Sequence, residues 1–161
     1  MSLQTTAVNS DSVQLVGFTV DGEDFGVDIL KVQEIIRMVD ITKMPNAPEY
    51  VEGVINLRGK VIPVVDFRKR FHLQEDAAEN HDNKRIVVVA LSHVTIGIVV
   101  DKVSQVLKLP TEHISATPDT VKGTDSEAIN GVGRLDDKLL ILLDLEKMFS
   151  VVEFEAMAQA A

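Results

Sequence analysis

The sequence predicts a mainly β protein made of two similar small units, and three observations point to this fold class. Val, Ile and Leu dominate the apolar 45% of the 161 residues, whereas aromatic residues contribute 4% and Trp is absent; β-branched side chains favour strands. Many short apolar runs are separated by turn residues, a pattern typical of an all-β sandwich or barrel. Motifs of the first half also recur, in the same order, in the second half.

The first elements are a tail and a hairpin. Residues 1–12 are polar and are interpreted as a flexible tail. Two apolar runs within residues 13–28 flank Asp21-Gly22, a dipeptide that supplies the positive φ angles of a tight hairpin. Residues 30–45 are ambiguous, because their apolar positions fit either a helical turn followed by a strand or one longer amphipathic helix.

A second hairpin is expected within residues 53–67, where two apolar runs meet at residues 58–60. Pro63 lies inside the second run and predicts an edge strand or a bulge, because proline cannot donate to a strand ladder. Asp66 stands at the N-cap position of a short helix over residues 67–71.

The second half begins after a polar, acidic linker at residues 72–84. The Gly-Val-Gly at residues 131–133 lacks the third glycine of a dinucleotide fingerprint, and is interpreted as a strand turn. The expected strands are residues 84–91, 93–100, 103–110, 129–135 and 138–145, with a loop at 111–128 and a final helical segment at 146–161.

The internal repeat is the most informative feature of the chain. We expect the halves to meet near residues 72–85. Neither unit is large enough to bury its apolar surface alone, so they should pack face to face, leaving a groove that suits a ligand or partner. The matching segments are 25–27 with 96–98, 31–36 with 102–107, 41–45 with 106–110, 53–57 with 131–135, and 60–71 with 138–149. The second and third matches share residues 106–107, so the register slips there.

Composition excludes several classes of function. The absence of Cys rules out a disulfide framework, a Cys-ligated metal and a thiol nucleophile, and favours a reducing compartment. The N-terminus has no signal-peptide pattern, and no apolar stretch approaches the roughly 20 residues that span a bilayer. A formal charge of −9 makes nucleic acid a poor partner. We therefore expect a soluble, cytoplasmic protein.

No reaction centre is expected either. The histidines at 72, 81, 93 and 113 show no one-turn spacing of zinc ligands. The sequence contains no nucleophile elbow and no phosphate-binding loop. The acidic pairs at 75–76 and 136–137 lie in expected turns, where solvated carboxylates are favoured over a catalytic dyad. No catalytic residue, metal or cofactor is predicted, and the protein is not expected to be an enzyme.

Two surfaces are candidates for binding. Residues 56–60, continued by residues 68–70, form a basic island in an acidic protein. For residues 68–70 the favoured interpretation is the solvated face of a helix. Arg58 differs, because a hairpin fixes the direction of its planar, multidentate donor. Residues 32–36 are the second candidate, and whether Val32 and Ile35 face the core or a partner stays open.

Three runs of this sequence resemble the CheW family of bacterial chemotaxis coupling proteins. They are GFTVDGEDFGVDILKVQEI, GVINLRGKVIPVVDFRKRF and IGIVVDKVSQVLKLP, of which the stretch from NLRG to VVDF is the most diagnostic. The resemblance covers about residues 13–150, followed by a helical tail at 151–161. It implies two intertwined five-stranded barrels, each similar to an SH3 domain, in agreement with the repeat.

The resemblance also implies a function. Proteins of this family bridge the cytoplasmic tips of methyl-accepting chemoreceptors to the histidine kinase CheA, which carries a homologous regulatory domain. They meet the membrane only through the receptors. Receptor-contacting roles are implied for Val32, Glu34, Arg58, Gly59 and Val103, and a coupling role with no assigned partner for Gly53 and Gly131. The alternatives are an isolated regulatory domain of a CheA-type kinase and, from another class, a small-ligand-binding β-barrel enzyme.

Overall fold

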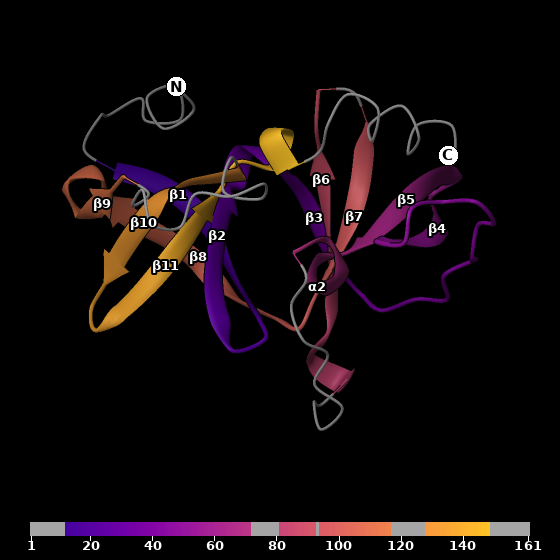
Figure 1. Ribbon diagram of the computed structural model, residues 1–161, viewed down its shortest axis with the longest axis horizontal. Coiled ribbons are helices and arrows are strands. Elements are labelled where there is room, and N and C mark those ends of the chain that lie inside the picture. Colours follow the sequence, from indigo (N-terminus) through magenta and orange to yellow (C-terminus); the bar gives the residue numbers. More distant parts are fainter. Residues whose placement is uncertain (1–11, 72–80, 93, 117–127, 149–161) are drawn as a thin grey trace.

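The computed structural model describes residues 12–71, 81–92, 94–116 and 128–148, which form two β-sheets with very little helix (Figure 1). The strands are β1 (Ser12–Val20), β2 (Glu23–Asp28), β3 (Val32–Arg37), β4 (Val51–Leu57), β5 (Lys60–Asp66), β6 (Arg85–Ala90), β7 (Thr95–Val100), β8 (Lys102–Pro110), β9 (Ile114–Ser115), β10 (Ile129–Leu135) and β11 (Lys138–Leu143). One α-helical turn, α2 (Phe67–Arg70), and four 3-10 turns, η1 (Ile29–Lys31), η2 (His81–Asn83), η3 (Thr111–His113) and η6 (Leu145–Met148), join them.

The two sheets exchange strands along the chain. Strands β8-β1-β2-β11-β10-β9 form a six-stranded sheet, which we call the terminal barrel, and β3-β6-β7-β5-β4 form a five-stranded sheet, the central barrel. The first hairpin of the chain therefore belongs with its last strands, and the chain crosses between the barrels twice (Figure 1). This confirms the prediction of two intertwined barrels, although the terminal barrel gains a sixth strand of only two residues, β9.

Strand register shows how the internal repeat is built. Gly26 of β2 pairs in parallel with Leu142 of β11, and Gly97 of β7 pairs in the same way with Val64 of β5. The matching segments at residues 25–27 and 96–98 thus occupy equivalent positions. Each unit contributes its first hairpin to the barrel that the other unit completes.

One of the matches in the repeat is wrong. Ile36 pairs with Ile86, whereas Leu107 pairs with Leu15, so residues 106–107 correspond to 35–36 and not to 41–42. Thr42 forms a bridge with Val54, and Ser115 pairs in the same way with Val132. Ser115 is therefore the counterpart of Thr42. The register slipped because β8 continues for nine residues and its counterpart β3 for six.

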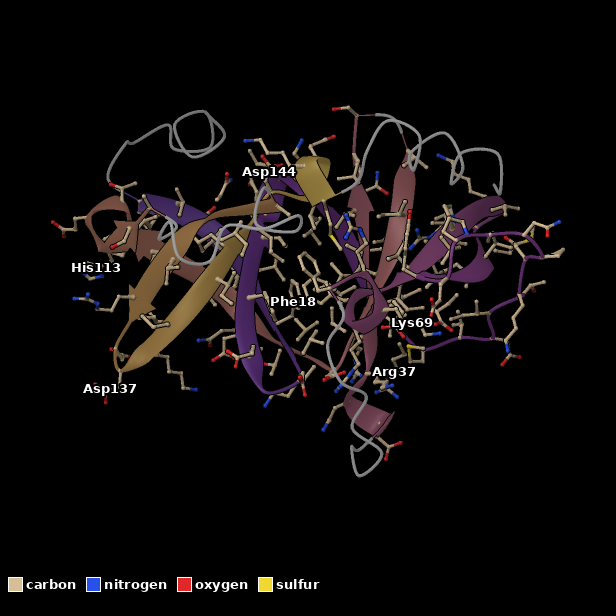
Figure 2. All side chains as sticks on the ribbon, viewed as in Figure 1. Phe18, Arg37, Lys69, His113, Asp137 and Asp144 are labelled. Atoms are coloured by element: carbon tan, nitrogen blue, oxygen red, sulfur yellow. The ribbon has the colours of Figure 1, made fainter. Side chains whose placement is uncertain are left out.

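Three apolar clusters hold the fold together. A central core cluster lies between the barrels and contains Phe18, Phe25 and Phe67, whose ring centroids are 4.8–5.6 Å apart; Figure 2 shows Phe18 at this seam. Each barrel also has its own interior. That of the terminal barrel contains Val13, Leu15, Leu107, Leu109, Leu140 and Leu142, and that of the central barrel Ile55, Ile62, Val64, Ile86, Val88 and Val99. This confirms face-to-face packing.

Burial on both faces explains why β6 is a continuous apolar run. Ile86 and Val88 point into the central barrel, whereas Val87 and Val89 belong to the central core cluster. Successive side chains of a strand point to opposite faces, so a strand buried on both sides carries no polar alternation.

Local chemistry decides the turns. Asp21 and Gly22 have φ angles of 54° and 76°, and the strands on either side pair in register, as the dipeptide predicted. The ambiguous segment forms a 3-10 turn followed by a strand. The Asp28 carboxylate caps η1 by accepting a hydrogen bond from the Leu30 amide at 2.9 Å, and exposure then alternates along β3.

Two local predictions are wrong, and a third is right in one of its two alternatives. Strand β5 is an interior strand, between β7 and β4, and not an edge, but its ladder with β4 contains a bulge, on the β4 side, directly next to Pro63. Pro63 is tolerated because the ladder with β7 begins only at Val64. Residues 131–133 lie within β10, which contains a register shift before Gly131, and do not form a turn. Ser12 is the first residue of β1 and not part of a tail.

Several predicted segments lie outside the described residues. They include residues 1–11 of the expected tail, most of the linker at 72–84, the loop residues 117–127 and the helical segment from residue 149 onward.

Candidate protein-interaction site

The structure brings together two residues that the resemblance implied separately. Arg58 occupies the β4–β5 turn with a φ angle of 52°, and Glu34 lies on β3. The two guanidinium nitrogens Nη1 and Nη2 of Arg58 donate to Oε2 and Oε1 of Glu34 at 2.5 and 2.8 Å, which makes the pair bidentate. The Arg58 side chain remains 73% exposed and that of Glu34 24% exposed. An oriented ion pair is therefore presented on the surface.

Each partner stabilises the charged form of the other. The hydrogen bond from Arg58 lowers the pKa of Glu34, and the same hydrogen bond raises the pKa of Arg58. Because an exposed ion pair contributes little to folding, its main effect is to fix the direction of the guanidinium. The Arg58 side chain is mostly exposed, so the N–H groups that do not bond to Glu34 can bind acceptor groups of a partner.

The hairpin turn holds Arg58 in place. Asn56 Oδ1 accepts a hydrogen bond from the Gly59 amide at 2.9 Å, and Leu57 pairs with Lys60 to close the turn. Gly59 has a φ angle of 83°, and a side chain there would meet no atom within 4 Å. Glycine is thus needed for backbone conformation, and its exposed backbone lies next to Arg58.

Val32 and Val103 lie at equivalent positions of the two units, at the seam between the barrels. Val32 pairs with Val89 of β6, and Val103 pairs with Phe18 of β1. Both are partly buried against the central core cluster. The question left open for Val32 is answered in part, because its side chain packs on this cluster while β3 also carries the exposed Ile35.

Sequence reasoning missed two exposed apolar residues that follow β3. Met38 and Val39 are exposed, as is Ile35 within the strand. Exposed large apolar side chains are common in protein-binding surfaces. The signal in the sequence is weak, since the two residues stand between the charged Arg37 and Asp40.

Gly53 and Gly131 have a clear structural explanation. Both follow register shifts, in β4 and in β10. A Cβ atom on Gly53 would lie 2.1 Å from the backbone oxygen of Thr42, and one on Gly131 would lie 2.7 Å from that of Ser115. The chain passes too close for any side chain. A coupling role for the two glycines stays a prediction.

The interpretation of residues 68–70 as a solvated helix face is wrong for Arg68. Its side chain is buried, and its Nε donates to Oδ1 of Asp101 at 3.1 Å, with a second bond from Nη2 to Oδ2. Lys69 is exposed and pairs with Glu52 at 2.6 Å, while Arg70 donates to the Met148 carbonyl. Because α2 follows β5 directly, its first side chains turn into the seam. The basic island therefore ends at the hairpin.

The described residues were also searched for cavities, metal ligands and membrane-spanning helices. A cavity of about 30 Å³, lined by residues such as Leu15, Asp28 and Asn130, has room for about one water molecule. No group of three or more His, Asp or Glu side chains is placed to hold a metal ion in the part of the chain that the structure describes. Within that same part, no helix is both long and apolar enough to cross a membrane.

Comparisons with known proteins identify the class to which these two intertwined barrels belong. A family model described as a CheW-like domain matches residues 14–153. The "Chemotaxis protein CheW" of Treponema pallidum (strain Nichols) is 37% identical, covering 94% of this chain and 91% of that protein. The "Chemotaxis protein CheW" of Klebsiella aerogenes is 39% identical, covering 84% and 81%.

A solved structure shows the same fold. The crystal structure of the scaffolding protein TtCheW from Thermoanaerobacter tengcongensis superposes with a TM-score of 0.79 at 35% identity, covering 88% of this chain and 94% of that one. The chain belongs to the CheW-like family. It is a chemotaxis adaptor, a scaffold of signalling complexes.

Proposed function

We propose that this adaptor couples the cytoplasmic tips of methyl-accepting chemoreceptors to the regulatory domain of the histidine kinase CheA. It acts in the cytoplasm, without catalysis, and meets the membrane only through the receptors. The names of its relatives and of the scaffold structure support this reading. The alternative of a kinase regulatory domain is not favoured.

The observation that carries the proposal is the bidentate Glu34–Arg58 pair. A receptor tip is a helical hairpin, and helices bind in grooves that combine apolar contacts with a few oriented polar groups. In this chain the polar groups are Arg58 and the backbone at Gly59, while the apolar contacts come from Val32 and Val103 at the seam. The adaptor changes kinase activity only through contacts that differ between the active and inactive states of the kinase.

The test is a substitution of Arg58. Arg58→Ala should weaken binding to a receptor cytoplasmic fragment by roughly ten- to hundredfold, because a charge-assisted hydrogen bond is lost. The melting temperature and the affinity for the kinase regulatory domain should hardly change, since the side chain is mostly exposed. Calorimetric titrations with each partner and a thermal melt measure all three.

Arg134→Ala is the matched control, because Arg134 is an exposed arginine on β10 of the terminal barrel. It should leave receptor binding unchanged. A large loss of melting temperature in Arg58→Ala would show a structural arginine. Equal receptor affinities for Arg58→Ala and the wild type would remove Arg58 from the site.

A further inference from the structure

The chain crosses between the barrels at two places, and an ion pair holds each crossing. The crossing from β7 to β8 contains Asp101, which pairs with Arg68 on α2. The crossing from β2 to β3 ends at Lys31, whose Nζ lies 3.1 Å from Oε2 of Glu146 on η6. We call these pairs the inner clasp and the outer clasp. In Figure 1, η6 lies at the top of the seam and α2 lower down.

The two clasps use equivalent helical-turn positions of the internal repeat, whereas their crossing residues differ, since Lys31 corresponds to Lys102 and not to Asp101. In each clasp the ion-pairing residue of the helical turn lies two positions after the aspartate that caps that turn. Asp66 accepts a hydrogen bond from the Arg68 amide at 2.9 Å, and Asp144, labelled in Figure 2, accepts one from the Glu146 amide at 3.0 Å. The two helical turns therefore present position 68 and position 146 in the same way.

Each clasp also fastens the connection between the two strands of a hairpin. Asp101 Oδ2 accepts a hydrogen bond from the Asp21 amide in the β1–β2 turn at 2.8 Å. Glu146 Oε2 accepts one from the Ser92 amide between β6 and β7 at 2.9 Å. In both cases one carboxylate joins a cation and a backbone amide that belong to different segments. The crossing, the hairpin and the helical turn are thereby tied together.

The clasps differ in polarity and in burial. In the inner clasp the crossing carries the carboxylate and the helical turn the cation; in the outer clasp the order is reversed. Arg68 and Asp101 are 6% and 3% exposed, whereas the side chains of Lys31 and Glu146 are 38% and 24% exposed. Breaking a buried pair leaves an uncompensated charge in the interior. An exposed pair contributes little and is screened by salt.

We propose that the outer clasp is the releasable connection between the barrels and that it positions β3, while the inner clasp stays closed. Lys31 directly precedes Val32 and lies three residues before Glu34, so freeing it loosens the strand that carries the candidate receptor site. The role of the outer clasp in positioning β3 for a receptor rests on the proposed function. The geometry agrees with the titration of Glu146: partial burial raises its pKa, but hydrogen bonds from Lys31 and Ser92 outweigh burial and leave the pKa below its ordinary value.

Hydrogen exchange on the full-length protein tests the clasp itself. Glu146→Gln removes the charge but keeps an acceptor for the Ser92 amide. In this variant the amides of residues 29–34 should exchange about two- to fivefold faster than in the wild type, which is the effect expected from the loss of one exposed ion pair. The wild type in 1 M sodium chloride should show the same increase. Amides at residues 99–103, next to the inner clasp, should not change.

A charge swap separates the ion pair from a general loss of stability. Lys31→Glu alone should exchange faster at residues 29–34, and adding Glu146→Lys should return the rates toward those of the wild type. Unchanged exchange at residues 29–34 in Glu146→Gln would overturn the proposal. A uniform increase at both crossings would overturn it as well, because the effect would then be global.

Receptor binding tests the positioning role. Glu146→Gln should weaken binding to a receptor cytoplasmic fragment by about two- to fivefold, since β3 must be fixed before it binds. Faster exchange with unchanged affinity would refute positioning while leaving the clasp intact. Failure of the wild type to bind the fragment would refute the proposed function and the positioning role together, whereas the exchange experiment would still decide whether the clasp opens.

Discussion

At the scale of single residues, the same side-chain type serves opposite purposes in this chain. Arg58 lies on a hairpin turn and stays exposed, whereas Arg68 lies ten positions further along the chain and is buried against Asp101. A guanidinium is always charged, so its burial requires a carboxylate partner and its exposure does not. Both arginines lie in basic stretches of the sequence, residues 58–60 and 68–70. Only the position of the partner separates them.

Asp66 gives a residue-scale prediction for pH dependence. Burial is the main cause that raises the pKa of this carboxyl group, although its hydrogen bond with the Arg68 amide acts in the opposite direction. A carboxyl group whose pKa is raised in the folded state contributes stability at low pH, and this is lost as pH rises from the unfolded pKa through the folded pKa. Asp66→Asn keeps the helix cap but carries no charge. It should therefore be more stable than the wild type at pH 7.

Urea unfolding between pH 3 and pH 8 measures this effect. The advantage of Asp66→Asn over the wild type should shrink as pH falls through the raised folded pKa toward the ordinary value for aspartate, and should be absent below that value. Asp28→Asn provides a control, because Asp28 also caps a helical turn. An advantage that is equal at every pH would mean that the charge of Asp66 is not involved.

At the scale of elements, the two bulged strands β4 and β10 close their barrels by contacting a preceding segment. In β4, Thr42 exchanges two backbone hydrogen bonds with Val54 at 2.8 and 2.9 Å, directly next to Gly53. In β10, Gly131 lies against Ser115. A bulge admits one extra residue and bends the strand, which brings the backbone of the neighbouring segment into the space of a side chain. Glycine is therefore a requirement of barrel closure.

Substitution of these glycines tests the closure. Gly53→Ala should destabilise the fold by about 3 kcal/mol or more, since the new Cβ would meet rigid backbone and the strand conformation is strained. Gly131→Ala should cost less, because its closest contact is 2.7 Å and not 2.1 Å. Gly59→Ala, in open space with a positive φ, should cost about 1–2 kcal/mol. Chemical denaturation of the three variants gives the order. A smaller loss for Gly53→Ala than for Gly59→Ala would contradict it.

At the scale of the whole molecule, the exchange of hairpins makes the two units dependent on each other. Each barrel contains strands from both halves of the chain. In the terminal barrel β1 pairs with β8 and β2 with β11, and in the central barrel β6 pairs with β3 and β7 with β5. The central core cluster takes side chains from both barrels as well. Neither half has a complete interior of its own in this arrangement.

Two fragments, 1–78 and 79–161, should therefore be unfolded alone and should fold when mixed. Each fragment lacks the hairpin that completes its sheet, and unpaired strands with a half-exposed core are not stable. Dispersion of amide NMR signals and size-exclusion chromatography follow the reconstitution. A fragment that folds alone would show that its own hairpin can replace the exchanged one, which is a rearrangement of the kind seen in domain swapping.

The sequence by itself determined the class of fold, the duplication and the hairpins. These features depend on interactions between near neighbours, such as the positive φ angles of Asp21-Gly22 and of Arg58-Gly59. The resemblance further supplied Glu34 and Arg58 as site residues. It could not show that they pair, because they lie 24 positions apart on different elements.

The tertiary structure alone decided which strands pair across the repeat, why Pro63 fits an interior strand and why Arg68 is buried. Arg68 and Asp101 are 33 positions apart. Both residues are charged, and nothing in the sequence around either one indicates that its side chain is buried. A buried ion pair depends on the direction of both side chains at once, and that direction follows from strand exchange between the barrels. Sequence periodicity reports which face of an element is apolar. It does not report which other element covers that face.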